Sequence, residues 1–318
     1  MKAQGKAPSV VRHVAGAEDA GQRLDNFLLR TLKGVPKSHI YRIVRSGEVR
    51  VNSRRADCTL RLAEGDEIRI PPVRTAAPAA TAPVPLRELP LVFEDEHLLV
   101  IDKPAGTAVH GGSGVSFGVI ELLRRARPQA RFLELAHRLD RETSGLLLVA
   151  KKRAALIALH DMLREGQVEK RYLALVRGDF RAAERHVQLP LLKTLLADGQ
   201  RHVTVDPAGR DAHSVVRRRA GWVVGGAACT LVEVELLTGR THQIRVHLAH
   251  LGHPLCGDEK YGDFALNREL QKRGLKRMFL HAAQLVLSHP ASGAAMRWES
   301  PLPADLQQYL DRLGAPSP

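Results

Sequence analysis

Apolar positions recur with helical spacing in the first part of the chain. In residues 23–32, RLDNFLLRTL, they fall at i, i+3, i+4 and i+8, which predicts an amphipathic helix. Residues 38–47, SHIYRIVRSG, repeat the pattern, with Ser38 as the expected N-cap and Gly47 as the residue that ends the helix. The runs EVRVNSRRA and GDEIRIP then alternate as short strands separated by turn residues. This part therefore predicts a small module of two helices and a sheet.

The rest of the chain is dominated by short apolar runs that predict strands. Runs at 89–93 and 98–101 predict a hairpin, and GLLLVA at 145–150 predicts a buried strand. EKRYLALVRGD and CTLVEVELLTG also have strand patterns, whereas ALIALHDMLREG has a helical one. The run THQIRVHLAHLG predicts a helix that Thr241 caps and Gly252 ends. Strands joined mainly by turns and hairpins indicate an α+β fold with a mixed, largely antiparallel central sheet.

A Pro- and Ala-rich stretch, PPVRTAAPAATAPVPLRELP, separates the two parts and has the composition of a semi-extended linker. The 318 residues, 44% of them hydrophobic, are enough for two domains and at least one sizeable core. The expected organisation is an N-terminal extension (1–20), the small α/β module (21–71), the linker (72–88) and a larger domain (89–314).

The excess of basic residues points to a polyanionic partner. The chain has 48 Lys and Arg against 34 Asp and Glu, a net charge of +14, and a pI near 10.2. Residues 21–70 alone have 11 basic against 6 acidic residues. Nucleic acid is the leading partner for so basic a protein. A basic face that is merely solvated would look similar in the small module.

The sequence shows no signal peptide and no membrane anchor. Its N-terminus, MKAQGKAPSVVRHVAG, lacks a continuous apolar segment, and no stretch approaches the ~20 apolar residues of a membrane span. We therefore expect a cytoplasmic protein without a membrane partner. Cys58, Cys229 and Cys256 are odd in number and far apart in the sequence, which predicts reduced thiols and no cysteine metal clamp.

The stretch LAHRLDRETSGLLLVAKK, residues 135–152, places a charged cluster directly before the buried strand. Asp140 lies at the mouth of that strand, where a carboxylate stays ionised only if a cation or hydrogen-bond donors hold it. A turn aspartate paired with Arg138 or Arg141 would explain the cluster. A functional carboxylate would explain it equally well.

A metal site and a nucleotide site are both disfavoured by spacing. His247, His250 and His253 recur every three residues, with His242 one turn earlier. On a helix His250 and His253 drift apart in angle, His253 falls beyond the predicted helix end, and the run contains no carboxylate or Cys. The Gly-rich HGGSG lacks the spacing of a phosphate-binding loop. We expect no metal.

A hydrolase is also disfavoured. His137, Asp140 and Ser144 have the residue types of a catalytic triad. Triad members normally come from separate segments, however, and no G-x-S-x-G elbow surrounds Ser144.

Several longer strings resemble known families. QRLDNFLLRTLKGVPKSHIYRIVRSGEVRVNSRR resembles the S4 RNA-binding domain, which packs two helices against a small sheet and binds structured RNA. The strings HRLDRETSGLLLVAK, EKRYLALVRG and LLTGRTHQIRVHLAHLGHPL resemble, in order and spacing, the motifs of the pseudouridine synthases of the ribosomal large subunit. The resemblance implies the pseudouridine synthase fold for the larger domain and an S4-like RNA-binding domain before it.

The resemblance implies specific roles. Asp140 would be the catalytic carboxylate, attacking uridine at ribose C1′ or uracil C6, or initiating cleavage of the glycosidic bond. Arg245 would pair with it, because enclosure would otherwise raise the pKa of that carboxyl. Tyr172 would stack on uracil, and its hydroxyl would assist transfer of the C5 proton. Arg138 would enter the RNA stack where the uridine leaves. No cofactor and no catalytic metal are implied.

The resemblance further implies RNA as the partner, either 23S rRNA or a large-subunit assembly intermediate, with several uridines modified and the protein acting as a monomer. Alternatives are the same chemistry on tRNA, a non-catalytic RNA-binding or ribosome-assembly protein, and a metal-dependent RNA nuclease. The expected RNA contacts are His137, Arg138, Arg141, Arg240 and His242 in the larger domain and Lys37, Arg42, Arg45 and Arg54 in the S4-like one.

Overall fold

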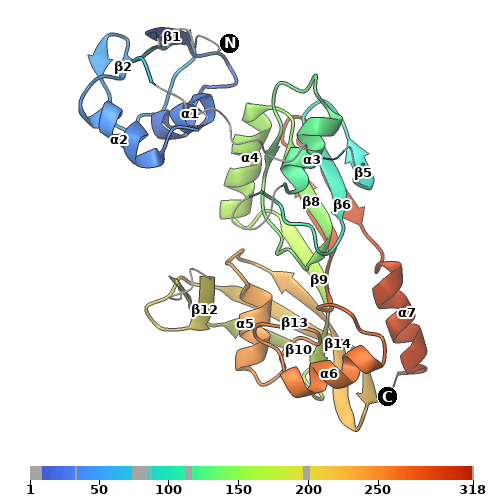
Figure 1. Ribbon diagram of the computed structural model, residues 1–318. Helices are drawn as coiled ribbons and strands as arrows, with labels where there is room; N and C mark the ends of the chain where they lie inside the picture. Colours follow the sequence, from blue (N-terminus) through green and yellow to red (C-terminus); the bar gives the residue numbers. More distant parts are fainter. Residues whose placement is uncertain are drawn as a thin grey trace, which may run out of the picture. The chain divides into compact units, whose positions relative to one another are not determined.

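The computed structural model describes residues 9–32, 34–73, 85, 88–111, 117–195 and 201–316 of the chain. The chain divides into two compact units, residues 1–83 and 84–318 (Figure 1). Most of the predicted linker and of the Gly-rich HGGSG segment lies outside the described residues, as do the first eight residues of the predicted extension.

The N-terminal unit packs two helices against a four-stranded antiparallel sheet with the strand order β1-β4-β2-β3. Its elements are β1 (Val11–Val14), α1 (Leu24–Thr31), α2 (Lys37–Arg45), β2 (Arg50–Val51), β3 (Arg54–Arg55) and β4 (Glu67–Ile70). The apolar faces of the helices share one core, in which Phe27, Leu28 and Ile40 are completely buried. The two helices predicted from their spacing are confirmed.

Two details of this unit differ from the prediction. Strand β1 falls within the predicted extension 1–20 but pairs with β4, so the sheet begins before residue 21. Its side chains are mostly exposed, so it lacks the apolar alternation that identifies a strand. Helix α2 begins at Lys37 after Pro36, and Ser38 is not its N-cap. Gly47, with φ 76°, follows the helix end as predicted.

The C-terminal unit is built on a ten-stranded sheet. Eight of its strands follow the order β10-β13-β14-β9-β15-β8-β6-β5, and the other two, β16 and β7, pair with β15 and β8. Its strands are β5 (Leu91–Glu94), β6 (Leu98–Lys103), β7 (Glu134–Leu135), β8 (Ser144–Ala150), β9 (Glu169–Arg177), β10 (Glu184–Gln188), β13 (His213–Val224), β14 (Ala227–Leu236), β15 (Leu280–Ser288) and β16 (Ala295–Glu299). Every pairing is antiparallel except that of β15 with β8. The predicted mixed, largely antiparallel sheet is confirmed, as are the β5–β6 hairpin and the buried strand β8.

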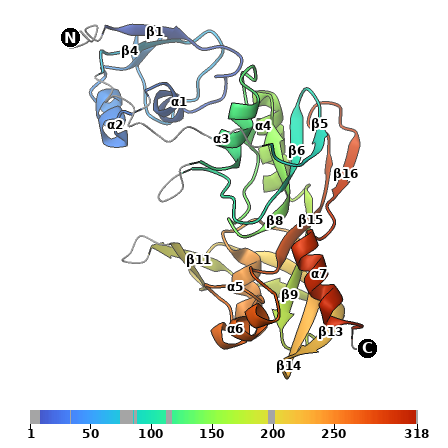
Figure 2. The same ribbon diagram turned by 45° about the vertical axis from the view of Figure 1, so that its right-hand side comes forward.

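Helices pack around this sheet, and a separate hairpin extends beside α5 (Figure 2). These elements are α3 (Val119–Ala126), α4 (Arg153–Arg164), β11 (Leu191–Leu195), β12 (Arg201–Val205), α5 (Gln243–His250), α6 (Phe264–Lys272) and α7 (Ala304–Leu313). Cys229 and Cys256, distant in the sequence, meet in a buried cluster beneath α7 with their Sγ atoms 3.9 Å apart. That distance is too long for a disulfide, so both thiols are free.

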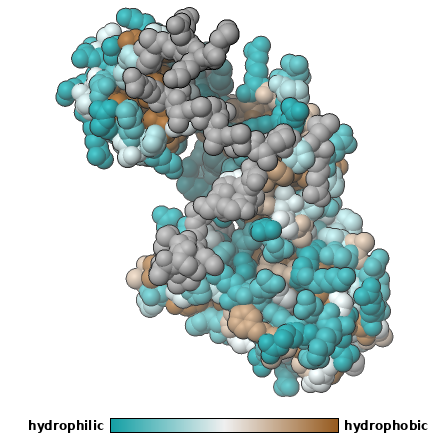
Figure 3. Space-filling model, viewed as in Figure 1, coloured by the Kyte–Doolittle hydropathy of each residue, from teal (hydrophilic) through white to brown (hydrophobic). Residues whose placement is uncertain are grey.

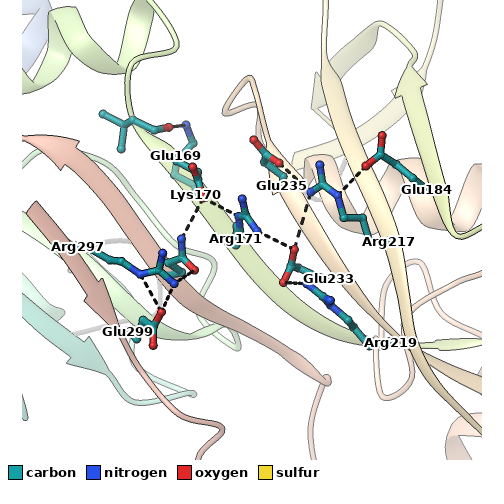
Figure 4. A network of polar contacts seen from close by, with 12 residues as sticks. Glu169, Lys170, Arg171, Glu184, Arg217, Arg219, Glu233, Glu235, Arg297 and Glu299 are labelled. Carbon is teal, nitrogen blue, oxygen red and sulfur yellow. Dashed lines mark hydrogen bonds and ion pairs between the residues drawn. The ribbon is translucent and has the colours of Figure 1, made fainter. Parts of the chain in front are cut away.

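The two faces of β9 and β14 have different characters. On one face Tyr172 and its neighbours join the main apolar core. On the other, ion pairs run from strand to strand, as the dashed lines of Figure 4 show. Arg171 of β9 and Arg219 of β13 both contact Glu233, and Arg217 contacts Glu235 of β14 at 2.8 Å. The arginine and glutamate side chains of the second face therefore neutralise one another's charge.

A close approach between two backbones joins β8 to β15. Gly145, at the start of β8, has φ 108°, and a Cβ built there would lie 2.2 Å from the carbonyl oxygen of Ala282. Ala282 in turn pairs with Tyr172 across β15 and β9. Only glycine fits at this contact, which places the start of β8 directly against β15, the strand that pairs with β9 on its other side.

Hydrophilic residues dominate the face of the protein seen in Figure 3. Within the described ranges, no helix has the length and apolar character needed to span a bilayer.

We predict that Gly145→Ala destabilises the C-terminal unit by about 3 kcal/mol, because the methyl group meets backbone and the positive φ is unfavourable for alanine. Gly252→Ala is the matched control, since Gly252 has φ 80° but open space around it, and we expect a loss of about 1 kcal/mol. Urea unfolding followed by the fluorescence of Trp222 and Trp298, both in this unit, measures the difference. Equal losses would contradict a steric role for Ala282.

Candidate active site

A cavity of about 370 Å³ opens on the apolar face of the sheet. Five segments line it: the loop 136–143 between β7 and β8, the end of α4, the start of β9, the segment 236–245 that leads from β14 into α5, and the start of β15. Asp140, Tyr172 and Arg245, which are far apart in the sequence, all face this cavity. Its volume is within the range of small-ligand pockets.

Asp140 is paired with Arg245 and not with its sequence neighbours. Its Oδ2 accepts a hydrogen bond from Nη1 of Arg245 at 3.0 Å. Arg141 instead donates to the carbonyl oxygen of Gly106, and Arg138 is exposed. The alternative of a turn aspartate paired with Arg138 or Arg141 is therefore wrong.

Arg245 is held from behind by a second carboxylate that the sequence reasoning missed. Asp258, completely buried, accepts from Nε and Nη2 of Arg245 at 2.7 and 2.8 Å. Burial acts to raise the pKa of Asp258, but the hydrogen bond and charge of Arg245 outweigh it and the pKa is lowered. The pKa of Arg245 is raised, since its two carboxylates outweigh burial. The guanidinium therefore stays charged between an anchoring carboxylate and one that faces the cavity.

Tyr172 presents its side chain from β9 into the same cavity and is 6% exposed. Burial, with a smaller contribution from the charge of Asp140, raises the pKa of its hydroxyl. The phenol is therefore neutral near pH 7. It offers a flat apolar face and an O–H group, not a phenolate base.

His242 occupies an unusual backbone position at the start of α5. It is the N-cap residue, with φ 54° and ψ 22°, so the predicted cap at Thr241 is wrong. The side chain of Gln243 causes this, because its Oε1 accepts from Thr238 Oγ1 and from the amide of Arg240 and closes the turn. The Nε2 atom of His242 lies 3.9 Å from Oδ1 of Asp140.

Comparison with known proteins identifies the family of the chain. Residues 97–250 match the family model described as RNA pseudouridylate synthase, and residues 22–68 match the S4 domain. Ribosomal large subunit pseudouridine synthase C of Escherichia coli (strain K12) is 51% identical over 316 residues, covering 97% of this chain and 98% of that protein. The chain belongs to the pseudouridine synthase family. The protein of the same name from Yersinia pestis is 51% identical over 309 residues, covering 95% of each chain.

Two solved structures have the same fold as this pseudouridine synthase. Human RNA pseudouridylate synthase domain containing 1 is 26% identical, with a TM-score of 0.56, and covers 74% of this chain and 99% of its own. Human RNA pseudouridylate synthase domain containing 4 is also 26% identical, with a TM-score of 0.57. The match covers 70% of this chain and 92% of that structure's chain. The α+β pseudouridine synthase fold and the N-terminal S4 domain are thereby confirmed.

His137 of the synthase supports the loop from inside the protein. Its Nε2 accepts from the amide of Leu148 at 3.0 Å, which leaves the proton of the neutral ring on Nδ1. Burial, and less strongly the charge of Lys170, lowers the pKa of His137 to about 4. Ser144 bonds to His281 and not to His137, so the residues of the supposed triad do not act together.

Lys103 also supports the loop that carries Asp140, a role that the sequence did not predict. Its completely buried ammonium group donates to the carbonyl oxygens of Pro104, Thr107 and Arg141. Burial lowers the pKa of Lys103 to about 8, although Glu142 and Asp140 oppose this effect. The backbone next to Asp140 is thus fixed by a buried cation.

Two further histidines of the α5 region, His247 and His253, have structural partners. His247 is buried, with its Nδ1 against Ser214 Oγ and its Nε2 against the carbonyl oxygen of Leu189. His253 contacts the carbonyl oxygen of Arg177. The described residues contain no group of three or more potential metal ligands.

The Lys and Arg residues predicted to contact RNA lie at the surface, whereas His137 and His242 are only partly exposed. Arg138 and Arg240 line the cavity and are exposed, and Arg141 is exposed in the same loop. Those of the S4 domain are exposed as well: Lys37, Arg42, Arg45 and Arg54. These positions are accessible to RNA, and their contacts stay predictions.

We predict that Asp258→Asn destabilises the C-terminal unit by about 3 kcal/mol at pH 7, because it breaks a buried ion pair. Since folding lowers the pKa of Asp258, its contribution is present above the ordinary value of about 3.9 and is lost as the pH falls through the lower folded value. The difference between the variant and wild type should therefore shrink below about pH 4. Urea unfolding at several pH values tests this. Glu259→Gln, an exposed neighbour, should change stability by less than about 0.5 kcal/mol.

Proposed function

We propose that this synthase isomerises uridines of 23S rRNA to pseudouridine, with Asp140 as the catalytic carboxylate. The observation that carries the proposal is the pairing of Asp140 with Arg245 at the cavity wall, backed by the second carboxylate of Asp258. A carboxylate repels the phosphates of RNA, so one that ion pairs orient in a cavity of a positively charged protein supports a role in the reaction. Arg245 orients the carboxylate of Asp140 through this ion pair, and the loop between β7 and β8 presents it at the edge of the buried strand β8.

The reaction needs the uridine outside the RNA stack, because its C1′ and C5 atoms are inaccessible within a helix. In this proposal Arg138, which is exposed two residues before Asp140 and lines the cavity, fills the position that the base leaves. Tyr172 then gives the captured uracil a flat surface. Asp140 engages the nucleotide, the C1′–N1 bond breaks, the base turns and C5 bonds to C1′. The C5 proton then leaves and N1 gains a proton. The product is an isomer of the substrate, so the reaction balances without redox change or hydrolysis.

Three observations favour rRNA of the large subunit as the substrate. The relatives that match nearly the whole chain are named for the large ribosomal subunit. The S4 domain suits structured RNA, and the net charge of +14 suits a polyanion. We further propose that one chain is sufficient, since it supplies every residue of the site, and that the protein works in the cytoplasm on rRNA or an assembly intermediate.

Pseudouridine mapping of 23S rRNA and of tRNA from cells that lack the protein tests the substrate. Specific pseudouridines should disappear from 23S rRNA and return when wild type is expressed, but not when Asp140→Asn is expressed. Loss confined to tRNA would redirect the proposal to tRNA. Unchanged maps would overturn it.

Asp140→Asn should reduce isomerisation below detection while RNA binding persists, because the amide keeps the size and an acceptor oxygen but not the charge. Tritium release from a [5-³H]uridine rRNA fragment measures turnover, and filter binding measures affinity. Glu142→Gln, which removes an exposed charge from the same loop, is the matched control and should stay active. Measurable turnover by the Asn variant would remove Asp140 from the catalytic role.

Tyr172→Phe and Tyr172→Ala separate stacking from proton transfer. The Phe variant keeps the ring, so base capture should survive while release of the C5 proton slows. The Ala variant should also lose affinity, since stacking of a base on an aromatic ring contributes about 1–3 kcal/mol. Single-turnover kinetics that follow binding and tritium release distinguish the two effects. Equal tritium release by Phe and wild type would leave Tyr172 as a stacking surface only.

A further inference from the structure

His242 has a strained backbone conformation, and its side chain faces the carboxylate of Asp140. Its φ of 54° is in the left-handed region, which few residues other than glycine adopt. Such conformations cost about 1–3 kcal/mol and persist where the surrounding structure enforces them, often at functional sites. Here the conformation turns the imidazole into the cavity, with its Nε2 atom 3.9 Å from Oδ1 of Asp140.

The hydrogen bonds behind His242 determine which ring nitrogen carries the proton. The amide of Val203, on β12, donates to the hydroxyl oxygen of Tyr261 at 3.1 Å. That hydroxyl lies 2.9 Å from Nδ1 of His242, and because its oxygen already accepts from Val203, we assign its own proton to this contact. A neutral imidazole has one N–H group, so the proton of His242 is on Nε2, the atom that faces Asp140.

The imidazole is neutral at the pH of the cell. Burial lowers the pKa of His242 to about 4; the charges of Arg245 and Lys260 act in the same direction, whereas those of Asp140 and Asp258 oppose it. His242 is thus a hydrogen-bond donor and not a cation. The gap of 3.9 Å is too long for a hydrogen bond to Asp140, but an atom of the substrate placed between the two can lie about 3 Å from each.

We propose that His242 is a further catalytic residue, which donates its Nε2–H to a carbonyl oxygen of uracil and stabilises the negative charge that develops on the base. This inference rests on the proposed function. When the C1′–N1 bond breaks, its electron pair moves onto N1 and the adjoining carbonyl. That pair forms the new bond when C5 attacks C1′; the C5–H electron pair then returns to the ring as the C5 proton leaves, and N1 takes up a proton from solvent. His242 keeps its proton throughout, and a preorganised donor of this kind needs no rearrangement during the reaction.

Tyr261 is a positioning residue that acts through His242. It is held in place by the amide of Val203 and by the guanidinium of Arg245, which lies 5.0 Å from the centre of its ring. The β11–β12 hairpin thereby fixes the tautomer of a residue in the cavity. This gives the hairpin a role in the reaction, although it is not part of the main sheet.

Two substitutions of His242 separate the donor from the backbone. His242→Asn preserves the left-handed conformation, which asparagine tolerates, but its amide reaches only to the position of Nδ1. His242→Gln places an N–H group near the position of Nε2. We expect the Asn variant to isomerise uridine about 10²-fold more slowly, with RNA affinity unchanged, and the Gln variant to recover part of the rate. His250→Asn, an exposed histidine at the end of α5, is the matched control and should match wild type.

The decisive measurement compares two rRNA fragments that carry either uridine or 5-fluorouridine at the target position. Fluorine stabilises the same negative charge, so the loss caused by His242→Asn should shrink to less than about 10-fold on the fluorinated fragment. Single-turnover reactions, digested to nucleosides and separated by chromatography, report loss of the original N-glycoside in both cases. Equal losses on the two fragments, or no loss on uridine, would overturn the role of His242. Failure of wild type on the uridine fragment would instead overturn the proposed function itself.

The role of Tyr261 is tested by a double-mutant cycle. Tyr261→Phe keeps the ring but frees Nδ1 of His242 to hold the proton, so the rate on uridine should fall. If Tyr261 acts only through His242, the variant that combines Tyr261→Phe with His242→Asn should be no slower than His242→Asn alone. A further slowing in the combined variant would overturn this linkage.

Discussion

The site depends on one buried guanidinium shared between two carboxylates. Removing Arg245 from water is costly, and the cost is offset only because Asp258 binds it at two nitrogen atoms and Asp140 at the third. The division of labour follows from burial. Asp258 is completely enclosed and serves as an anchor, whereas Asp140 faces the cavity and is available to a substrate. If Arg245 had only one carboxylate partner, the same group would have to hold the cation and react with the substrate.

The sheet positions the residues around this interaction so that they meet at one cavity. Gly145 lets β8 approach β15 closely, Lys103 fixes the backbone beside Asp140, and Tyr172 enters from the neighbouring strand β9. All of this chemistry lies on the apolar face. The ion pairs of the opposite face, such as Arg217 with Glu235, use up positive charge that would otherwise attract RNA there (Figure 4).

The cavity is also lined by groups whose protonation is determined by burial. The pKa values of His137 and His242 are each lowered to about 4, chiefly by burial, so both rings are neutral. The hydroxyl of Tyr172 stays protonated for the same reason. Around the ion pairs that Arg245 makes with Asp140 and Asp258, these neutral donors can respond to charge that appears on the base.

The sequence alone determined what depends on local periodicity and on long motifs. The spacing of α1, the strand β8 and the β5–β6 hairpin were all readable, and motif resemblance singled out Asp140, Tyr172 and Arg245. Strand β1 was missed because its exposed side chains show no apolar alternation. Asp258, Tyr261 and Lys103 look like any other polar residues in the sequence. Only the tertiary structure decided their partners, because burial and long-range contacts determine whether such a group is a solvated surface residue or part of a site.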